Sequence, residues 1–387
     1  RILILHSGRL SPQRFLLASH KTAVAVSLAH HKNNESAMTL QRIAVAGAGL
    51  IGRRHIELIQ ASSACQLCAL VDPAPAAAAL AQAAGVPLYA SLEQLFAAQR
   101  PDGVILATPN QLHVQGALAC VEQGVAALIE KPVAHSLAEG KHLLAIAEQH
   151  GARLLVGHHR AHSAILDKAR EVIAEGVLGN LVAVMGSALF YKPDDYFDAA
   201  PWRRAAGGGP VLINMIHEIG NLRSLCGEIV AVQAQASSAT RGFAVEDSVA
   251  ISLRFASGAL GTFMLSDTAA CARSWEQTAR ENLDYPSYAD EDCYVIAGTR
   301  GSLSIPTMRL KYYERDEDRS WWKPFSTAIA SQDQADPLQR QLAHFCQVIR
   351  GEAQPLVTVR DGLRNLQIVD AIAQAARSGQ TVHTESL

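Results

Sequence analysis

The sequence predicts an α/β protein, in which a parallel sheet wound with helices is followed by an α+β domain with a mostly antiparallel open sheet. From residue 42 to about residue 156, short apolar segments alternate with helical patterns, which is typical of a parallel sheet covered on both faces. Beyond residue 181 the apolar residues recur with a period of two, as in strands that bury one face. We expect the two domains to span residues 38–160 and 161–387.

Composition narrows the classes of function. Of 387 residues, 49% are hydrophobic and 18% are charged, and 34 basic residues balance 36 acidic ones. This balance gives no electrostatic footprint for nucleic acid or an anionic membrane, and no apolar run approaches the roughly 18 residues of a membrane span. Seven scattered cysteines indicate reduced thiols rather than a disulfide framework. We therefore expect a cytoplasmic protein that binds neither nucleic acid nor membranes.

Residues 1–37 differ from the rest of the chain. They begin with Arg1 and hold five Lys or Arg against a single acid, Glu35. A transit segment, which is rich in arginine and poor in acids, has this character. Upstream sequence in front of a natural start at Met38 would explain it equally well. We favour the second interpretation and treat residues 1–37 as an extension that is disordered or not native.

In the first domain, strands are expected at residues 42–46, 66–71, 86–89, 103–107, 125–129 and 153–156. The first of them continues into a glycine-spaced turn. Gly47 allows a sharp turn, Gly49 leaves no side chain between backbone and pyrophosphate, and Gly52 lets the next helix pack closely. Asp72 ends the second strand, where a carboxylate can hold ribose hydroxyls. Together these features predict a Rossmann dinucleotide-binding domain, with the helix N-terminus at Leu50 and Ile51 facing the phosphates.

Two later strands end in short polar segments, at residues 107–110 and 130–132. Ligands of open parallel sheets bind outside the carboxyl ends of the strands, so both segments should border the nicotinamide half of the cofactor. The residues expected to bind it there are Thr108, Pro109, Asn110, Glu130 and Lys131. Asn110 also has an ordinary structural role open to it, as the cap of a helix over residues 111–123.

The second domain begins with a helix at residues 163–175 and continues mainly with strands. These are expected at residues 181–189, 229–238, 247–255, 258–265, 293–297, 302–305 and 308–313. One helical insert lies near 214–226, and helices near 338–350 and 362–377 close the chain. An antiparallel sheet can leave one face open, and a broad apolar face there would indicate burial against a second subunit.

Lys131 is the first candidate for catalysis. It ends a strand at the cofactor cleft, and strand alternation points it away from the side chain of Glu130. A lysine in a partly desolvated cleft has a lowered pKa and can relay a proton near neutral pH. His217 is the second candidate, because a histidine takes up a hydroxyl proton at working pH. Asn214, three residues earlier, would share its helical face and orient the substrate or the ring.

These residues together resemble the Gfo/Idh/MocA oxidoreductases, a family that includes glucose-fructose oxidoreductase and inositol 2-dehydrogenase. The resemblance covers nearly everything from Ile43 onward. Its motifs are Gly-Ala-Gly-Leu-Ile-Gly with Arg54 and His55, Ala-Thr-Pro-Asn with His113, Glu-Lys-Pro at 130–132, three glycines before His217, and Gly-Thr-Arg-Gly-Ser-Leu at 298–303. It implies an NAD(P)-dependent dehydrogenase of a sugar, cyclitol or related hydroxy compound, working as a homodimer or homotetramer joined through the open sheet.

The resemblance carries the catalytic lysine onto Lys131, the acid/base histidine onto His217 and a cofactor contact onto His113. Many members have Asp four residues before the histidine and Gly two before it. Here those places hold Ile213 and Met215, so the helper carboxylate does not transfer.

Cofactor choice depends on Asp72, because its charge repels a 2′-phosphate and the residues after it supply no basic partner. We expect NAD. Arg53 and Arg54 are the argument for NADP, but they lie in the first helical turn, where exposure at the surface is the ordinary explanation, so NADP stays possible.

The substrate pocket is expected to take its outer wall from the segment before the glycine run. The residues are Tyr191, Tyr196, Trp202 and Arg203, with Lys131, Asn214 and His217 at the reacting centre. Aromatic faces with carboxylates suit a polyhydroxylated ring, while adjacent arginines suit the carboxylate of a sugar acid; a solvated charged loop is the alternative. We assign no metal, since His158, His159 and His162 have no evident acidic or cysteine partner.

The sequence thus predicts a dehydrogenase in which Lys131 and His217 handle the hydroxyl proton while hydride moves to the nicotinamide. Two alternative functions remain. One is a non-catalytic sensor that binds NAD, although a sensor needs neither of these residues. The other is an NAD-dependent glycoside hydrolase of the same fold, which returns its hydride and releases no net NADH.

Overall fold

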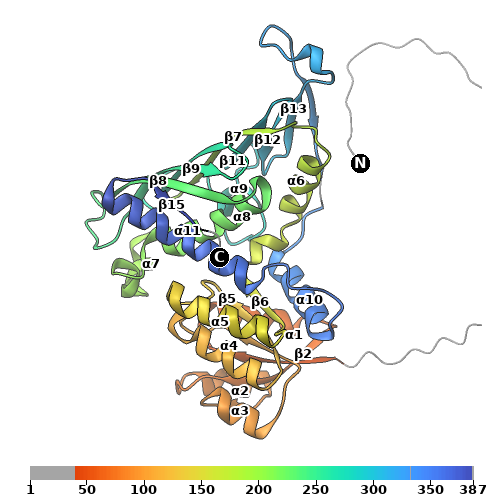
Figure 1. The fold of residues 1–387 in the computed structure, drawn as a ribbon. Helices are drawn as coiled ribbons and strands as arrows, with labels where there is room; N and C mark the ends of the chain where they lie inside the picture. Colours follow the sequence, from red (N-terminus) through yellow and green to blue (C-terminus); the bar gives the residue numbers. More distant parts are fainter. Residues whose placement is uncertain (1–39, 332, 386–387) are drawn as a thin grey trace, which may run out of the picture.

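The structure, a computed structural model, describes residues 40–331 and 333–385 and contains two sheets, each with its own helices (Figure 1). The extension predicted over residues 1–37 lies outside the described residues. Within the described part, no helix is long and apolar enough to cross a bilayer. Both predicted domain types are confirmed, and their strands follow the predicted order.

The first sheet has six parallel strands in the order β3-β2-β1-β4-β5-β6. Its strands are β1 (Gln41–Ala46), β2 (Cys65–Val71), β3 (Leu88–Tyr89), β4 (Gly103–Leu106), β5 (Ala126–Glu130) and β6 (Leu154–Gly157). Its helices are α1 (Leu50–Gln60), α2 (Ala77–Ala84), α3 (Leu92–Ala98), α4 (His113–Glu122) and α5 (Leu137–Gln149). Strands β4, β5 and β6 are buried at every residue, as expected of strands covered on both faces.

The second sheet has nine strands in the order β14-β13-β12-β11-β7-β10-β9-β8-β15. They are β7 (Leu181–Leu189), β8 (Ile229–Ser237), β9 (Ser248–Phe255), β10 (Leu260–Ser266), β11 (Tyr294–Gly298), β12 (Gly301–Ile305), β13 (Arg309–Tyr312), β14 (Ser326–Ile329) and β15 (Val382–His383). Only β7 and β10 pair in parallel; the other pairs are antiparallel. Strands β14 and β15 are absent from the prediction, because segments this short carry little alternation.

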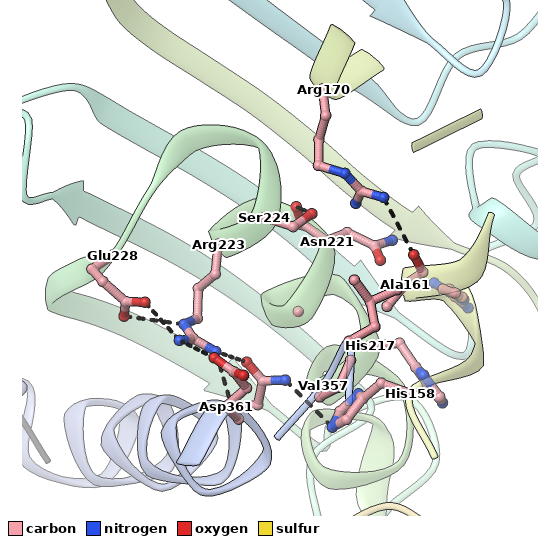
Figure 2. Close-up of a pocket in the computed structure, with 14 residues that line it drawn as sticks. His158, Ala161, Arg170, His217, Asn221, Arg223, Ser224, Glu228, Val357 and Asp361 are labelled. Atoms are coloured by element: carbon pink, nitrogen blue, oxygen red, sulfur yellow. Dashed lines mark hydrogen bonds and ion pairs between the residues drawn. The ribbon is translucent and has the colours of Figure 1, made fainter. Parts of the chain in front are cut away.

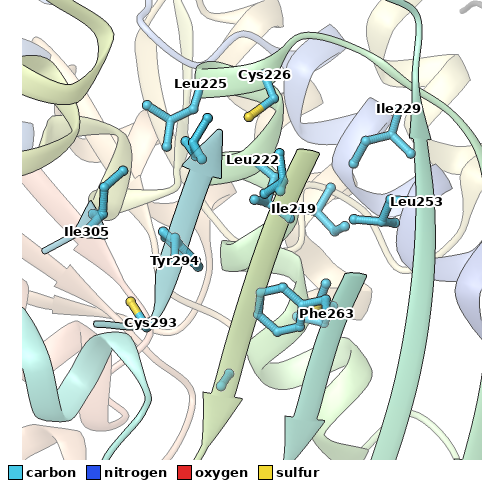
Figure 3. Close-up of a cluster of buried hydrophobic side chains, with 14 of the residues drawn as sticks. Ile219, Leu222, Leu225, Cys226, Ile229, Leu253, Phe263, Cys293, Tyr294 and Ile305 are labelled. Atoms are coloured by element: carbon cyan, nitrogen blue, oxygen red, sulfur yellow. The ribbon is translucent and has the colours of Figure 1, made fainter. Parts of the chain in front are cut away.

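Helices cover one face of this second sheet and leave the other open. The cover consists of α6 (Ala164–Ala174), α8 (Ile216–Cys226) and α11 (Val359–Ser378), with the short α9 (Trp275–Thr278). Figure 3 shows Ile219 and Leu222 of α8 packed towards Phe263 and Tyr294 of the sheet. The opposite face exposes large apolar side chains on three strands: Met185, Leu260, Met264 and Ile329.

The two parts are tied together by the last third of the chain. Helix α10 (Pro337–Arg350) packs against the first sheet, where Phe345 and Ile349 meet strand residues of one buried cluster. Helix α11 shares residues with the cores of both parts. The short helix η2 (His159–His162) follows β6 and contacts α8 and α10. The carboxyl end of the first sheet is therefore brought against α8 (Figure 1).

Candidate active site

The glycine turn after β1 is made almost entirely of backbone. Gly47 has a φ of +97°, and a Cβ there would lie 2.3 Å from the Ala107 carbonyl oxygen. A Cβ at Gly52 would lie 1.9 Å from the Gly47 carbonyl oxygen, so both glycines are needed for close packing. A Cβ at Gly49, in contrast, would meet nothing within 4 Å. That open space, beside the free N–H groups at the start of α1, fits the pyrophosphate of a dinucleotide.

The carboxylate of Asp72 is held beside this turn. One oxygen accepts from the backbone N–H of Ala48 at 2.7 Å, and the other from that of Ala74 at 2.8 Å. Each oxygen keeps a lone pair for a ribose hydroxyl. Of the two arginines in α1, Arg54 pairs with Glu57 and Asp336, while Arg53 donates to the Ala48 carbonyl at 3.1 Å. Leu50 is 87% exposed and Ile51 is half-buried, so both lie at the surface of the turn.

His113 connects the segments that follow β4 and β5. Its buried ring places Nδ1 2.7 Å from the Pro132 carbonyl oxygen and Nε2 2.9 Å from that of Thr108. Its contact is therefore with the two loops expected to border the cofactor. The capping role considered for Asn110 is wrong, because this residue begins the short helix η1 (Asn110–Leu112) and no side chain caps α4.

Glu130 is buried at the end of β5, and both oxygens of its carboxylate have hydrogen-bond partners within the protein. Its Oε1 lies 2.8 Å from Nε2 of His55, and its Oε2 accepts the backbone N–H of Lys131 at 3.2 Å. Burial raises the pKa of Glu130, but the hydrogen bond and charge of His55 outweigh it and hold that pKa below its usual value. Glu130 is thus ionised and fixes the position of His55 and of the Lys131 backbone.

The ammonium of Lys131 reaches across to the second part of the chain. Its Nζ donates to the Ile213 carbonyl at 3.4 Å. Burial lowers the pKa of Lys131, and the nearby Glu130 carboxylate offsets this only in part. Ile213 lies in a π-helical turn, η4 (Val211–Met215), a conformation that often marks functional sites. The same turn places Asn214, whose side chain contacts Lys192.

His217 follows in the first turn of α8 and is buried among other histidines. Its ring centroid lies 5.1 Å from that of His159 and 5.9 Å from that of His158. Burial, followed by the charge of Lys131, holds the pKa of His217 well below its usual value. Its Nδ1 has no hydrogen-bond partner among the described residues. The lowered pKa keeps the ring neutral, so one of its two nitrogens carries a proton and the other has a free lone pair.

Beneath His217, a buried ion-pair network fixes α8. Arg160 donates to Glu218 at 2.6 Å and to Glu276 at 2.5 Å, and the Tyr294 hydroxyl donates to Glu218. A buried carboxylate paired in this way resists displacement, because breaking such a pair leaves an uncompensated charge. The network therefore holds the residue next to His217 in place.

The expected substrate wall contains one residue that the sequence did not single out, Lys192. Its Nζ donates to Asn214 Oδ1 at 2.7 Å, lies 3.8 Å from Asp267, and sits 4.9 Å from the ring centroid of Tyr196. Burial lowers the pKa of Lys192 to about 8. Arg203 stacks 3.8 Å from the Tyr196 ring, whereas Tyr191 and Trp202 are more than half exposed.

Two family models match the chain. Residues 41–158 match an oxidoreductase family with an NAD-binding Rossmann fold, and residues 166–304 match the Gfo/Idh/MocA C-terminal domain. The chain belongs to the Gfo/Idh/MocA oxidoreductases. The predicted family, enzyme class and NAD cofactor are confirmed: the protein is an NAD(P)-dependent oxidoreductase.

The chain resembles several curated family members along most of their length. It is 28% identical over 309 residues to 1,5-anhydro-D-fructose reductase of Ensifer adhaerens, covering 76% of this chain and 84% of the relative. It is 27% identical over 342 residues to the rhizopine catabolism protein MocA of Rhizobium meliloti, covering 87% and 95%. Among solved structures, the WlbA dehydrogenase of Bordetella pertussis in complex with NADH and UDP-GlcNAcA superposes with a TM-score of 0.72. The two are 24% identical, and the match covers 89% of this chain and 99% of the other, which establishes a shared fold.

Proposed function

We propose that the protein transfers hydride between NAD and the hydroxyl-bearing carbon of a sugar, cyclitol or sugar acid, with Lys131 and His217 as its acid/base residues. The observation that carries this proposal is the contact of the Lys131 ammonium with the Ile213 carbonyl. Ile213 lies four residues before His217, so the contact brings a lysine of lowered pKa to the helix that carries a neutral histidine. His217 is buried and Lys131 is half-buried, and environments of this kind shift pKa values towards those that acid/base catalysis near neutral pH uses.

The bound nicotinamide would accept the hydride. Lys131 donates a hydrogen bond to the reacting oxygen and stabilises the charge that builds up as its proton leaves. His217 takes that proton, because its neutral ring has a free lone pair. Asn214 and Lys192 orient the neighbouring hydroxyls, and Tyr196 with Arg203 forms the outer wall.

The substrate class rests on the wall and on the relatives together. Lys192 and Arg203 bring two cations to aromatic rings, an arrangement that suits hydroxyl-rich rings and carboxylates alike. Relatives of this chain include D-apiose dehydrogenase, which is 25% identical over 360 residues, and inositol 2-dehydrogenase, 23% identical over 342 residues. We propose substrates of that chemical kind.

We also propose that the open face of the second sheet joins subunits into a dimer or tetramer. Four large apolar side chains are exposed there, at Met185, Leu260, Met264 and Ile329. An exposed apolar face of this kind favours association. Light scattering of the wild type and of Met185→Glu tests this, and a monomeric wild type would exclude it.

The test of activity is NADH formation by the purified protein with NAD and a panel of cyclitols, aldoses and sugar acids. We expect absorbance of reduced nicotinamide with one class of compound. If NAD binds, as calorimetry would show, and no compound yields NADH, the dehydrogenase proposal is wrong. Cleavage of glycosides without net NADH would then support a hydrolase of the same fold, and binding without either reaction a sensor.

A further inference from the structure

A cavity of about 230 Å³ borders His217 on α8 (Figure 2). Ile213, which contacts Lys131, precedes His217 in the chain, and the cavity residues Gly220, Asn221 and Ser224 follow it. His217 therefore lines the cavity and also lies close to Lys131. The volume has room for several waters, each of which occupies about 30 Å³ in the liquid.

Charged and polar side chains line this cavity together with apolar ones, and it reaches the surface. Ser224 and Glu228 on its rim are exposed, and Leu356 is 48% exposed. Arg223 on its wall pairs with Glu228 at 2.6 Å and lies 3.6 Å from Asp361. Two carboxylates thus stand where the cavity meets solvent.

The tautomer of His158, on the opposite wall, follows from its neighbours. Arg223 donates to Asn365 at 2.6 Å, and because arginine has no acceptor, the atom facing it must be the amide oxygen. The amide nitrogen of Asn365 then faces His158 Nε2 at 3.3 Å and donates to it. His158 is buried and neutral, since burial lowers its pKa to about 3. Its own proton is consequently on Nδ1.

That Nδ1–H points at α8 and has no partner among the described residues. A Cβ at Gly220 would lie 3.7 Å from it, which places it at the cavity wall one turn after His217. Nδ1 of His217, which lines the same cavity, is likewise buried without a partner. Ile213, four residues before His217, has an apolar side chain and so cannot accept a hydrogen bond from the His217 ring. Two buried polar atoms without a partner, beside a cavity with room for water, are the conditions under which ordered water is retained.

We propose that this cavity is the proton outlet of His217, with ordered water held by His158 and His217 leading to Glu228 and Asp361 at the rim. The inference rests on the proposed function. The hydroxyl proton of the substrate binds to His217 Nε2, and the proton on Nδ1 passes to the water. His217 takes up one proton from the substrate, the water releases one proton to solvent, and no electrons are transferred in this step. When the product departs, exchange at the front of the site restores the starting tautomer.

The relay gives His158 a role in positioning the water, which a packing residue would not have. In His158→Ala, we expect kcat to fall about tenfold or more, with KM and NAD affinity changed less than about twofold. The solvent deuterium isotope effect on kcat should rise. Imidazole, which can donate the same hydrogen bond to the water, should restore part of the rate through the enlarged cavity. Ser224→Ala, which changes the same cavity without removing a titratable group, is the control and should keep the wild-type rate.

A turnover and isotope effect equal to the wild type's in His158→Ala would overturn the relay, while NADH formation by the wild type would still support the proposed function. Neutron diffraction of the wild-type protein with NAD in heavy water tests the geometry whether or not a substrate is known. We expect deuterium on His158 Nδ1 and a water within hydrogen-bond distance of His217 Nδ1. Deuterium on His158 Nε2, or a dry cavity, would exclude the proposal.

Discussion

The glycine turn after β1 and the lysine–histidine cluster around α8 are built by different means. The turn consists of backbone from one continuous stretch, in which two glycines allow close packing and a third leaves room for a ligand. The cluster takes side chains from four segments: Lys131 after β5, His158 and His159 after β6, Lys192 after β7, and His217 on α8. A backbone site is sensitive to any added Cβ, whereas the cluster depends on burial to set the charge of each group.

Substitution of Lys131 gives the sharpest contrast between the two sites. In Lys131→Met we expect turnover to fall about 10²- to 10⁴-fold, as for loss of an acid/base residue, while NAD affinity changes little. Stopped-flow rates and calorimetry on the same preparation measure the two. Lys141→Met, at an exposed position of α5, is the control. Equal loss of turnover and NAD binding would mean that the two sites are not separable.

Substitution in the turn should have the opposite effect. Gly49 has a φ of −71°, which alanine adopts, and its Cβ would enter open space. In Gly49→Ala we expect unchanged thermal stability and an NAD affinity about tenfold lower or worse, since the backbone can no longer approach the pyrophosphate. Gly47→Ala is the matched comparison. Its positive φ and the 2.3 Å approach to Ala107 should cost at least about 1–2 kcal/mol of folding stability. NAD binding by Gly49→Ala as tight as the wild type's would rule out this cradle.

The same contrast explains what could be predicted. The turn is local, so glycine spacing and the position of Asp72 were enough to place it, and parallel topology put Lys131 at the right edge of the sheet. The partners of the cluster are not local. His158 and His159 lie nearly sixty residues before His217 in the chain, and only folding brings their rings within 6 Å of it.

Lys192 was hidden for a related reason. It stands in a charged loop beside Tyr191, and a lysine there is ordinarily solvated. Its burial comes from Phe190, Tyr196 and Asn214, which converge on it from two segments. The π-helical turn escaped prediction as well, because its residues have the composition of an ordinary helix start.

Asp72 combines features of both sites, because it is a side chain that binds the backbone of the glycine turn at Ala48. Asp72→Asn keeps the shape and removes the charge that repels a 2′-phosphate, so the preference for NAD over NADP should fall about tenfold. Ratios of kcat/KM with the two cofactors measure it. Asp102→Asn makes the same change in the loop before β4, at the amino-terminal end of the strands and away from the glycine turn. It should leave the ratio unchanged. An unaltered ratio in Asp72→Asn would assign cofactor choice to Arg53 or another group.

The smallest expected effect is a pH dependence of stability that the cluster has and the turn lacks. Burial lowers the pKa of Lys192 from 10.5 to about 8. Between these values the unfolded chain holds a proton that the folded protein has released, so stability rises with pH. We expect Lys192 to add about 1 kcal/mol to the unfolding free energy over the first pH unit above 8. Urea unfolding of the wild type and of Lys192→Met at both ends of that unit isolates this contribution, with Lys141→Met as the exposed control. Parallel changes in all three proteins would mean that Lys192 keeps its proton when folded, and that burial in the cluster does not control its charge.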